Sequence, residues 1–238
     1  MTPVEAVLGA VIMAAGAFLQ GAVGFGANLM AAPLLALVLD DFVPGPVIVA
    51  SVLLNLLVMQ REGTGNVDRR IHAAIAGQIP GALVAGLVLS SLSRSGLSIV
   101  FALVVLAGVG LSIGGWHIRP STPTLVAAGA TAGFMGTISG IGGPPIALVY
   151  QSADGPTLRG TLSRFFLAGA AVAIPTLLVV GALDRDSIAP SLALLPGTTL
   201  GFVLSAHLAR RIDKGAVRPV VLWLSALSAV AVVVREVL

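Results

Sequence analysis

The chain of 238 residues contains no cysteine, few aromatic side chains and few charged ones. Without cysteine it can form neither disulfide bonds nor thiolate metal sites. Charged residues make up 10% of the chain and hydrophobic residues 57%, and the mean hydropathy is +1.04. So little polar surface cannot cover a soluble globule of this size. The sequence therefore predicts a protein whose surroundings are a lipid bilayer.

Net positive charge is also scarce, although the calculated pI is about 10.6. Thirteen Lys and Arg residues stand against ten acidic ones, which gives a net charge of +3. The basic residues are spread over short connections between apolar stretches. This distribution is typical of an orientation signal in a membrane protein and not of a nucleic-acid-binding patch. The sequence also has no cluster of metal-ligating residues, so we predict no metal, no cofactor and no nucleic-acid partner.

The alternation of polar and apolar residues that marks a strand is absent, and the apolar residues form eight long stretches instead. Most have about 17 to 22 residues, enough for a helix to cross a hydrocarbon core of about 30 Å. We therefore predict an all-α integral membrane protein. The stretches fall at residues 3–39, 43–60, 73–92, 96–115, 123–152, 161–182, 187–206 and 219–235.

Two of these stretches, the first and the fifth, are too long for one ordinary crossing. Each is interrupted near its middle by a glycine-rich segment, at residues 20–28 in the first and residues 139–145 in the fifth. We call these segments the first break and the second break. Glycine and proline are tolerated in membrane helices where neighbours or water satisfy the freed backbone groups. The breaks therefore indicate places where a helix ends and a second one begins inside the membrane.

The two breaks correspond to each other in sequence. A shift of 116 residues places Gly24 and Gly26 on Gly140 and Gly142, and each break precedes an apolar run and an acidic loop. This spacing indicates an internal repeat with four stretches in each copy. The predicted copies span residues 1–120 and 121–238, within one membrane domain.

The distribution of basic residues tests how the broken stretches are threaded. If each crosses once, Lys and Arg divide six against seven between the two sides; if each turns back as a hairpin, they divide ten against three. The larger imbalance favours hairpins, because basic residues collect in cytoplasmic loops. Each copy then crosses an odd number of times, so we predict inverted repeats with both termini outside. The ten predicted cytoplasmic residues are Arg61, Arg69, Arg70, Arg119, Arg159, Arg164, Arg210, Arg211, Lys214 and Arg218.

Inverted repeats with glycine or proline interruptions at matching positions are typical of secondary transporters, whose site lies near the bilayer midplane. A broken helix exposes backbone N–H groups at the start of its second half, where the helix dipole adds partial positive charge. We therefore predict a small anion as substrate and alternating access around the two hairpin tips. The candidate binding residues in the breaks are Gln20, Gly21, Gly24, Gly26, Asn28, Ser139, Gly140, Gly142, Gly143 and Pro144.

Four further polar residues extend this candidate site. Ser51 and Asn55 lie one helical turn apart on the stretch after the first break, so both can face the same cavity. Their alternative role is an interhelical hydrogen bond. Arg159 and Arg164 bracket the start of the sixth stretch, where either one presents a cation to the anion or extends to the membrane interface as an ordinary anchor.

Other interpretations compete with a transporter. The break glycines can serve only close helix packing, which is the reading we prefer for the pairs Gly77 and Gly81, Gly110 and Gly114, and Gly197 and Gly201. The chain would then be a non-transporting assembly partner, and a channel is the nearer alternative. An intramembrane protease is disfavoured, because Thr137 stands where a glycine-serine protease motif has glycine. We predict no enzymatic activity and no catalytic residue.

The motifs of both breaks resemble those of the sulfite exporter TauE/SafE family of membrane permeases. The sequence around the first break reads FLQGAVGFG over residues 18–26 and continues with APLL over residues 32–35. The sequence around the second break reads GFMG over residues 133–136 and SGIGGPP over residues 139–145, and RGTL follows at residues 159–162. The similarity extends over essentially the whole chain and is most specific at the breaks.

This resemblance implies a multi-pass protein of a bacterial or archaeal cytoplasmic membrane. It implies transport of a sulfur-containing anion such as sulfite, thiosulfate, a sulfonate or an organosulfur acid. Exporters and importers both occur in the family, so the direction of transport does not carry over. The residues themselves do not determine the coupling ion or the oligomeric state, and a homo-oligomer is one alternative.

Overall fold

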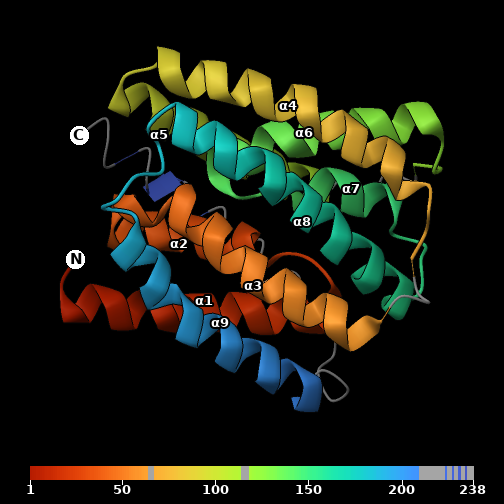
Figure 1. The fold of residues 1–238 in the computed structure, drawn as a ribbon, viewed down its shortest axis with the longest axis horizontal. Coiled ribbons are helices and arrows are strands. Elements are labelled where there is room, and N and C mark those ends of the chain that lie inside the picture. Colours follow the sequence, from red (N-terminus) through yellow and green to blue (C-terminus); the bar gives the residue numbers. More distant parts are fainter. Residues whose placement is uncertain are drawn as a thin grey trace.

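A computed structural model describes residues 1–63, 67–113 and 118–208, together with residues 223, 227, 230, 231 and 234. All regular structure in these ranges is helical, and long helices lie side by side in one bundle (Figure 1). Six helical segments among the described residues are long and apolar enough to cross a bilayer. The chain is therefore a multi-pass membrane protein, as predicted. The six are Pro3–Val23, Asp40–Glu62, Ile71–Ser91, Ser95–Ile113, Gly155–Val179 and Ile188–Ala206.

The first half of the chain begins with a strongly capped helix. The Thr2 side chain accepts a hydrogen bond from the Glu5 N–H, and the Glu5 carboxylate accepts one from the Thr2 N–H, which satisfies two backbone donors at the helix start. The helix ends where Gly24 adopts a left-handed backbone. The elements of this half are α1 (Pro3–Val23), α2 (Ala27–Val38), the short 3₁₀ helix η1 (Asp40–Phe42), α3 (Gly45–Glu62), α4 (Ile71–Ser91) and α5 (Arg94–Ile113).

The second half continues with α6 (Thr122–Ser139), α7 (Gly143–Val149), α8 (Gly155–Val179) and α9 (Ile188–Leu208). Helix α8 begins earlier than the predicted residue 161. Asp154 caps it by accepting a hydrogen bond from the Thr157 N–H at 3.0 Å, and Pro156 suits its first turn. That first turn is polar, so a search for apolar stretches missed it. The predicted stretch 219–235 lies outside the described residues, apart from a few single positions.

The chain turns back at both breaks, as the hairpin prediction requires. Gly9 near the start of α1 lies against the Phe42 ring of η1, so the segment after the first break returns toward the end where α1 begins. Leu125 at the start of α6 and Tyr150 just after α7 share one hydrophobic cluster. The returning helices are short, with 12 residues in α2 and 7 in α7. At 1.5 Å per residue, α2 covers about 18 Å, which is less than a full crossing.

Two close helix pairs connect the halves of the chain. Gly77 and Gly81 of α4 lie against the backbone of α6, and Gly197 and Gly201 of α9 lie against the backbone of α1. A methyl group at any of these glycines would collide with a facing backbone carbonyl, so the predicted packing role fits all four. By contrast, no described atom comes within 4 Å of a Cβ built on Gly110 of α5, so the predicted packing role does not fit this glycine among the described residues. Its predicted partner Gly114 lies outside them.

The hydrophobic core has one large cluster beside each hairpin. The cluster beside the α1–α2 hairpin includes Met13, Leu35, Phe42, Leu177 and Leu194. The cluster beside the α6–α7 hairpin includes Leu125, Ile146, Tyr150, Leu162 and Phe165. Helix α8 contributes to both clusters, through Leu177 in the first and Leu162 and Phe165 in the second. It therefore joins the two hairpins along its length.

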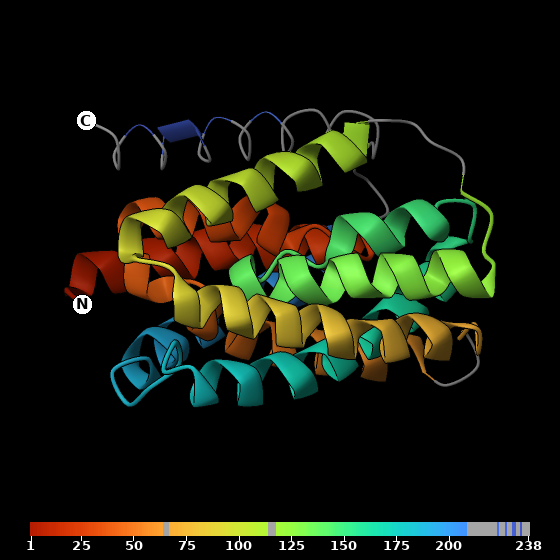
Figure 2. The same cartoon turned by 90° about the horizontal axis from the view of Figure 1, so that it is seen from above.

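The two ends of the bundle carry opposite charge. The connections 39–44 and 180–187 lie at one end, and residues 67–70 and 150–154 lie at the other (Figures 1 and 2). We call the first the acidic end and the second the basic end. The acidic end carries Asp40, Asp41, Asp184 and Asp186 against Arg94 and Arg185. The basic end carries six arginines, Arg61, Arg69, Arg70, Arg119, Arg159 and Arg164, against Glu62, Asp68 and Asp154.

Candidate functional site

A cavity of about 70 Å³ lies at the contact between the two breaks. The Asn28 side chain at the start of α2 donates a hydrogen bond from Nδ2 to the Gly140 carbonyl at 2.9 Å. Phe25 of the first break lies against Gly143 of the second. Segments more than a hundred residues apart in sequence are therefore in direct contact, and they enclose a space for a small solute.

Gly24 and Gly140 have the same backbone geometry in their respective breaks. Their φ angles are +112° and +77°, which are left-handed values that favour glycine. The Gly24 N–H donates to the Gln20 carbonyl and the Gly140 N–H donates to the Gly136 carbonyl, each at 2.7 Å. Each glycine thereby ends a long helix and lets the chain reverse.

The helices that start after the breaks differ in the donors they offer. Gly26, at φ +101°, precedes α2 with no side-chain cap, so the first N–H groups of α2 have no intrahelical partner. Gly26, Asn28 and Leu29 all line the cavity, so this helix start faces it. Helix α7 begins with Gly143 followed by two prolines, which carry no N–H. The backbone donors at the cavity therefore come mainly from the first break.

The polar side chains of the first break are hydrogen-bonded to α3. Gln20 donates from Nε2 to the Asn55 Oδ1 at 2.9 Å, and Asn28 donates from Nδ2 to the Ser51 Oγ at 2.9 Å. Asn55 in turn donates from Nδ2 to the Ser51 carbonyl at 2.7 Å. These side chains therefore join two helices and also line the cavity. Their bonds fix the shape of the wall.

Nine of the fourteen predicted site residues line the cavity, and five do not. The Ser139 hydroxyl donates to the Met135 carbonyl at 2.8 Å and accepts from the Ile141 N–H at 3.2 Å, so it shapes the second break instead. Gly21 lies against Ser205 of α9. The nine lining residues are Gln20, Gly26, Asn28, Ser51, Asn55, Gly140, Gly142, Gly143 and Pro144. The other five are Gly21, Gly24, Ser139, Arg159 and Arg164.

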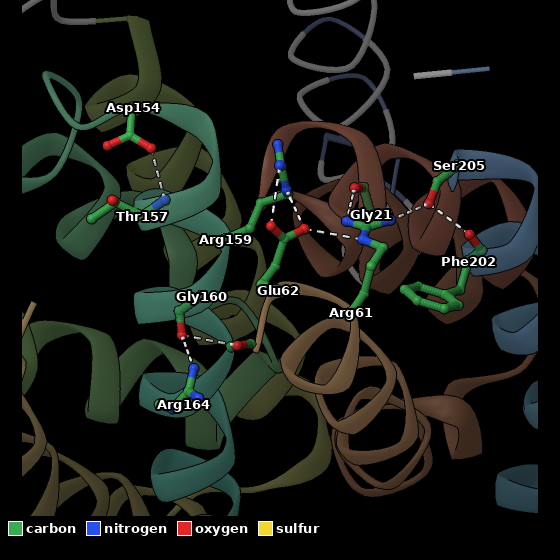
Figure 3. Close-up of polar contacts among 11 residues, drawn as sticks. Gly21, Arg61, Glu62, Asp154, Thr157, Arg159, Gly160, Arg164, Phe202 and Ser205 are labelled. Atoms are coloured by element: carbon green, nitrogen blue, oxygen red, sulfur yellow. Dashed lines mark hydrogen bonds and ion pairs between the residues drawn. The ribbon is translucent and has the colours of Figure 1, made fainter. Parts of the chain in front are cut away.

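Arg159 is one partner in an ionic network at the basic end of the bundle (Figure 3). The Glu62 carboxylate, whose side chain is 8% exposed, accepts hydrogen bonds from Arg159 Nε at 2.7 Å and from Arg61 Nε at 3.0 Å. Arg61 also donates to the Gly21 carbonyl and to the Ser205 Oγ. The network therefore ties together α1, α3, α8 and α9. We call it the Glu62 network.

Arg164 binds backbone carbonyls at the same end. Its guanidinium donates to the Gly160 carbonyl and to the Gly63 carbonyl, each at 2.8 Å (Figure 3). Gly63 directly follows the last turn of α3, so Arg164 satisfies a carbonyl at that helix end. The structure thus gives both predicted arginines protein partners outside the cavity. None of the described residues that line the cavity is charged.

Gln78 and Thr137 line the cavity but were missed by sequence reasoning. Their side chains are buried, and the Gln78 Oε1 and Thr137 Oγ1 atoms have no hydrogen-bond partner among the described residues. A lone glutamine in an apolar stretch was a usable signal for Gln78, by the same argument that selected Gln20. Thr137 gave no comparable signal, because helical threonines usually bond to their own backbone.

A second hollow lies at the acidic end, with a volume of about 510 Å³. It is separate from the cavity at the breaks, and none of the residues that line it was predicted as part of the site. A hydrogen bond from Ser187 lowers the pKa of Asp184, so this carboxylate is ionised at neutral pH. The acidic residues that line this hollow are Asp40, Asp41, Asp184 and Asp186. The described residues contain no group of acidic or histidine side chains arranged to hold a metal ion.

Membrane transporters commonly have a cavity where broken helices meet inside the bundle, and this fold has such a cavity. A family model described as sulfite exporter TauE/SafE matches residues 8–232, nearly the whole chain. The chain belongs to this family, whose members are membrane transporters of sulfite and related sulfur anions. Searches of curated proteins and of solved structures gave no match. The family resemblance seen in the two breaks is thereby confirmed.

Proposed function

We propose that this chain is a secondary transporter of a small sulfur-containing anion: sulfite, thiosulfate, a sulfonate or an organosulfur acid. The observation that carries the proposal is the cavity formed where the two breaks touch, with Asn28 of one break bonded to the Gly140 carbonyl of the other. Helix breaks that meet inside a membrane bundle expose backbone groups to a solute and not to lipid. Family membership supplies the class of substrate.

The donors at the cavity support an anionic substrate. Helix α2 starts there without a side-chain cap, so its free N–H groups and the positive end of its dipole favour negative charge. The unpaired hydroxyl of Thr137 adds a side-chain donor. No described lining residue carries a negative charge that would repel an anion. The proposed contacts are thus mostly backbone N–H groups, and the side chains of Gln20, Asn28, Ser51 and Asn55 support them.

We further propose that the two halves, residues 1–120 and 121–238, are inverted repeats that alternate access to the cavity. Two equivalent helix contacts support this proposal. Helix α4 of the first half packs on α6 of the second, and α9, which corresponds to α4, packs on α1 of the first half. The Glu62 network joins α3 of the first half to α8 of the second at the basic end. By the positive-inside rule this end is cytoplasmic. The membrane would be the bacterial or archaeal cytoplasmic membrane.

Transport assays in proteoliposomes test this function directly. We expect saturable uptake of at least one labelled anion among sulfite, thiosulfate and small sulfonates, together with counterflow when the same anion is loaded inside. Protein-free vesicles and vesicles with an unrelated membrane protein are the controls. Flux that neither saturates nor supports counterflow would favour a channel. No flux of any sulfur anion, with no thermal stabilisation by any of them, would contradict the proposal.

A further inference from the structure

Gln78 is a buried polar side chain that the protein satisfies only in part. It lies on α4, is 3% exposed and lines the cavity. Its Nε2 donates to the Phe165 carbonyl of α8 at 3.2 Å, whereas its buried Oε1 has no partner among the described residues. A buried acceptor left without a donor is costly, so such groups in native proteins usually have a partner. A solute bound in the cavity can supply that donor.

The packing around Gln78 determines which atom of the amide remains free. A Cβ built on Gly169 of α8 would lie 2.8 Å from Nε2 and 3.5 Å from Oε1, so glycine at this position makes room for the amide. Reversing the amide would place its oxygen against the Phe165 carbonyl oxygen, and two acceptors repel each other. The free atom is therefore an acceptor. It cannot bind an anionic oxygen, but it can bind an N–H or O–H group of a solute.

Thr137 provides the complementary group in the same cavity. It lies on α6, is 1% exposed, and its hydroxyl has no partner among the described residues. Other helical threonines, such as Thr131 and Thr198, donate to the carbonyl four residues earlier. The free Thr137 hydroxyl can donate to an anionic oxygen. The cavity thus presents both a donor and an acceptor, and neither is charged.

We propose, building on the transport function above, that Gln78 selects anions carrying an N–H or O–H group on the atom that bears the anionic oxygens or beside it. Hydrogensulfite and sulfonates with an adjacent amino or hydroxyl group meet this requirement. The sulfite dianion, sulfate and simple alkylsulfonates leave the Gln78 oxygen unpaired. A monoanion also costs less to bury than a dianion where no lining side chain supplies positive charge. The substrate class is a monoanionic sulfur oxyacid with its own hydrogen-bond donor.

Sulfamate and methanesulfonate form a matched pair of probes. Both are small monoanions with three sulfur-bound oxygens, and they differ by an amino group in place of a methyl group. We expect the wild-type protein in proteoliposomes to transport radiolabelled sulfamate roughly tenfold better in kcat/KM, because methanesulfonate leaves a buried acceptor unpaired. This comparison needs no variant, so it does not depend on whether a mutant folds.

Two variants assign the preference to Gln78. Gln78→Leu removes the acceptor, so the ratio of sulfamate to methanesulfonate transport should fall to about one or below. Thr137→Val removes a donor to the anionic oxygens, so it should lower transport of both probes by a similar factor and leave their ratio unchanged. Thermal unfolding in detergent shows whether each variant is folded.

The outcomes separate this inference from the function on which it rests. Equal wild-type transport of sulfamate and methanesulfonate would overturn the role of Gln78 and would still support an anion transporter. An unchanged preference in a folded Gln78→Leu protein would also overturn it. Absence of flux for both probes, for sulfite and for thiosulfate would overturn the proposed function, and the selectivity proposal with it.

Discussion

Gly140 satisfies two constraints at a single position. Its φ angle of +77° ends α6, and its carbonyl accepts the hydrogen bond from Asn28 that joins the two breaks. A Cβ at this position would lie 2.9 Å from the Val47 side chain and 3.3 Å from the Asn28 Nδ2. Any side chain at this position would therefore both strain the backbone and push the breaks apart.

We predict that Gly140→Ala abolishes transport beyond what its effect on stability explains. Gly181 offers a matched control, because its φ is +73° but no described atom lies within 4 Å of the added methyl. Both substitutions should lower the free energy of unfolding by about 1 kcal/mol or more through left-handed strain. Only Gly140→Ala should lose transport. Thermal unfolding and anion flux measured on both variants check this, and normal flux in Gly140→Ala would refute the role of the contact.

Side chains in the breaks were easier to predict than their partners. Gln20 and Asn28 stand out because they interrupt an apolar stretch, and a polar side chain in lipid must face the protein interior. The partner of Arg159 could not be predicted, because Glu62 lies 97 positions away and only the packing of α3 on α8 brings them together. Gln78 lies between Gly77 and Gly81, and the predicted packing role of these glycines already accounted for the segment. Sequence patterns thus do not show which side chains pair between helices that are far apart in the chain.

At the level of helices, the Glu62 network holds α3 and α8 together at the basic end. We predict that this contact closes the cavity toward the basic end. Glu62→Gln should weaken the contact, because Arg61 and Arg159 lose their counter-charge while the side-chain volume is kept. A cysteine introduced at Ala170, which lines the cavity, should then react roughly tenfold faster with a membrane-impermeant thiol reagent added from the basic side. The reaction rate at this single cysteine is the measurement.

Asp68→Asn provides the control for this experiment. Asp68 forms an ion pair with Arg70 in the loop between α3 and α4, where the Asp68 side chain is 17% exposed and that of Arg70 is 62% exposed. The pair lies within one loop and joins no two helices, so this variant should leave the labelling rate unchanged. Equal labelling in Glu62→Gln and wild-type protein would show that the Glu62 network does not close the cavity.

The close contact of α4 with α6 makes a second prediction for the helices. Gly77→Ala forces these helices apart, because the added methyl collides with the α6 backbone at Val126. We expect a loss of about 1 to 3 kcal/mol in the free energy of unfolding. Gly110→Ala on α5 meets no described atom within 4 Å and should gain about 0.5 to 1 kcal/mol from higher helix propensity. Unfolding in denaturing detergent measures both, and similar destabilisation of the two would argue against tight packing at Gly77.

For the whole molecule, the placement of charge predicts the topology. The chain has no cysteine, so single cysteines can be labelled without background. We predict that Arg69→Cys and Arg119→Cys react from the cytoplasmic side, and that Asp41→Cys and Asp186→Cys react from the outer side. Labelling of intact and permeabilised cells distinguishes the sides. A further variant, Asp154→Cys, tests the second break, because α6 and α7 lie between residues 119 and 154. Labelling of Arg119→Cys and Asp154→Cys from opposite sides would contradict the hairpin arrangement of this break.

The absence of charge from the described cavity lining has an electrical consequence. An empty site carries no charge across the membrane when the helices rearrange, whereas a site holding a monoanion carries one negative charge. Without a coupled ion, transport is therefore electrogenic. An inside-negative potential acts on that charge with about 2.3 kcal/mol per 100 mV, equal to an outward concentration gradient of roughly fiftyfold.

A potassium diffusion potential imposed on proteoliposomes measures this effect. We expect an interior-negative potential to speed anion efflux and slow influx. Voltage-independent flux would instead require a coupled cation that cancels the charge. If transport is electrogenic, the same polypeptide would export its anion from an energised cell and equilibrate it across a depolarised one. The direction of net transport would be set by the membrane voltage together with the concentration gradient of the anion, and not by any residue of the binding site.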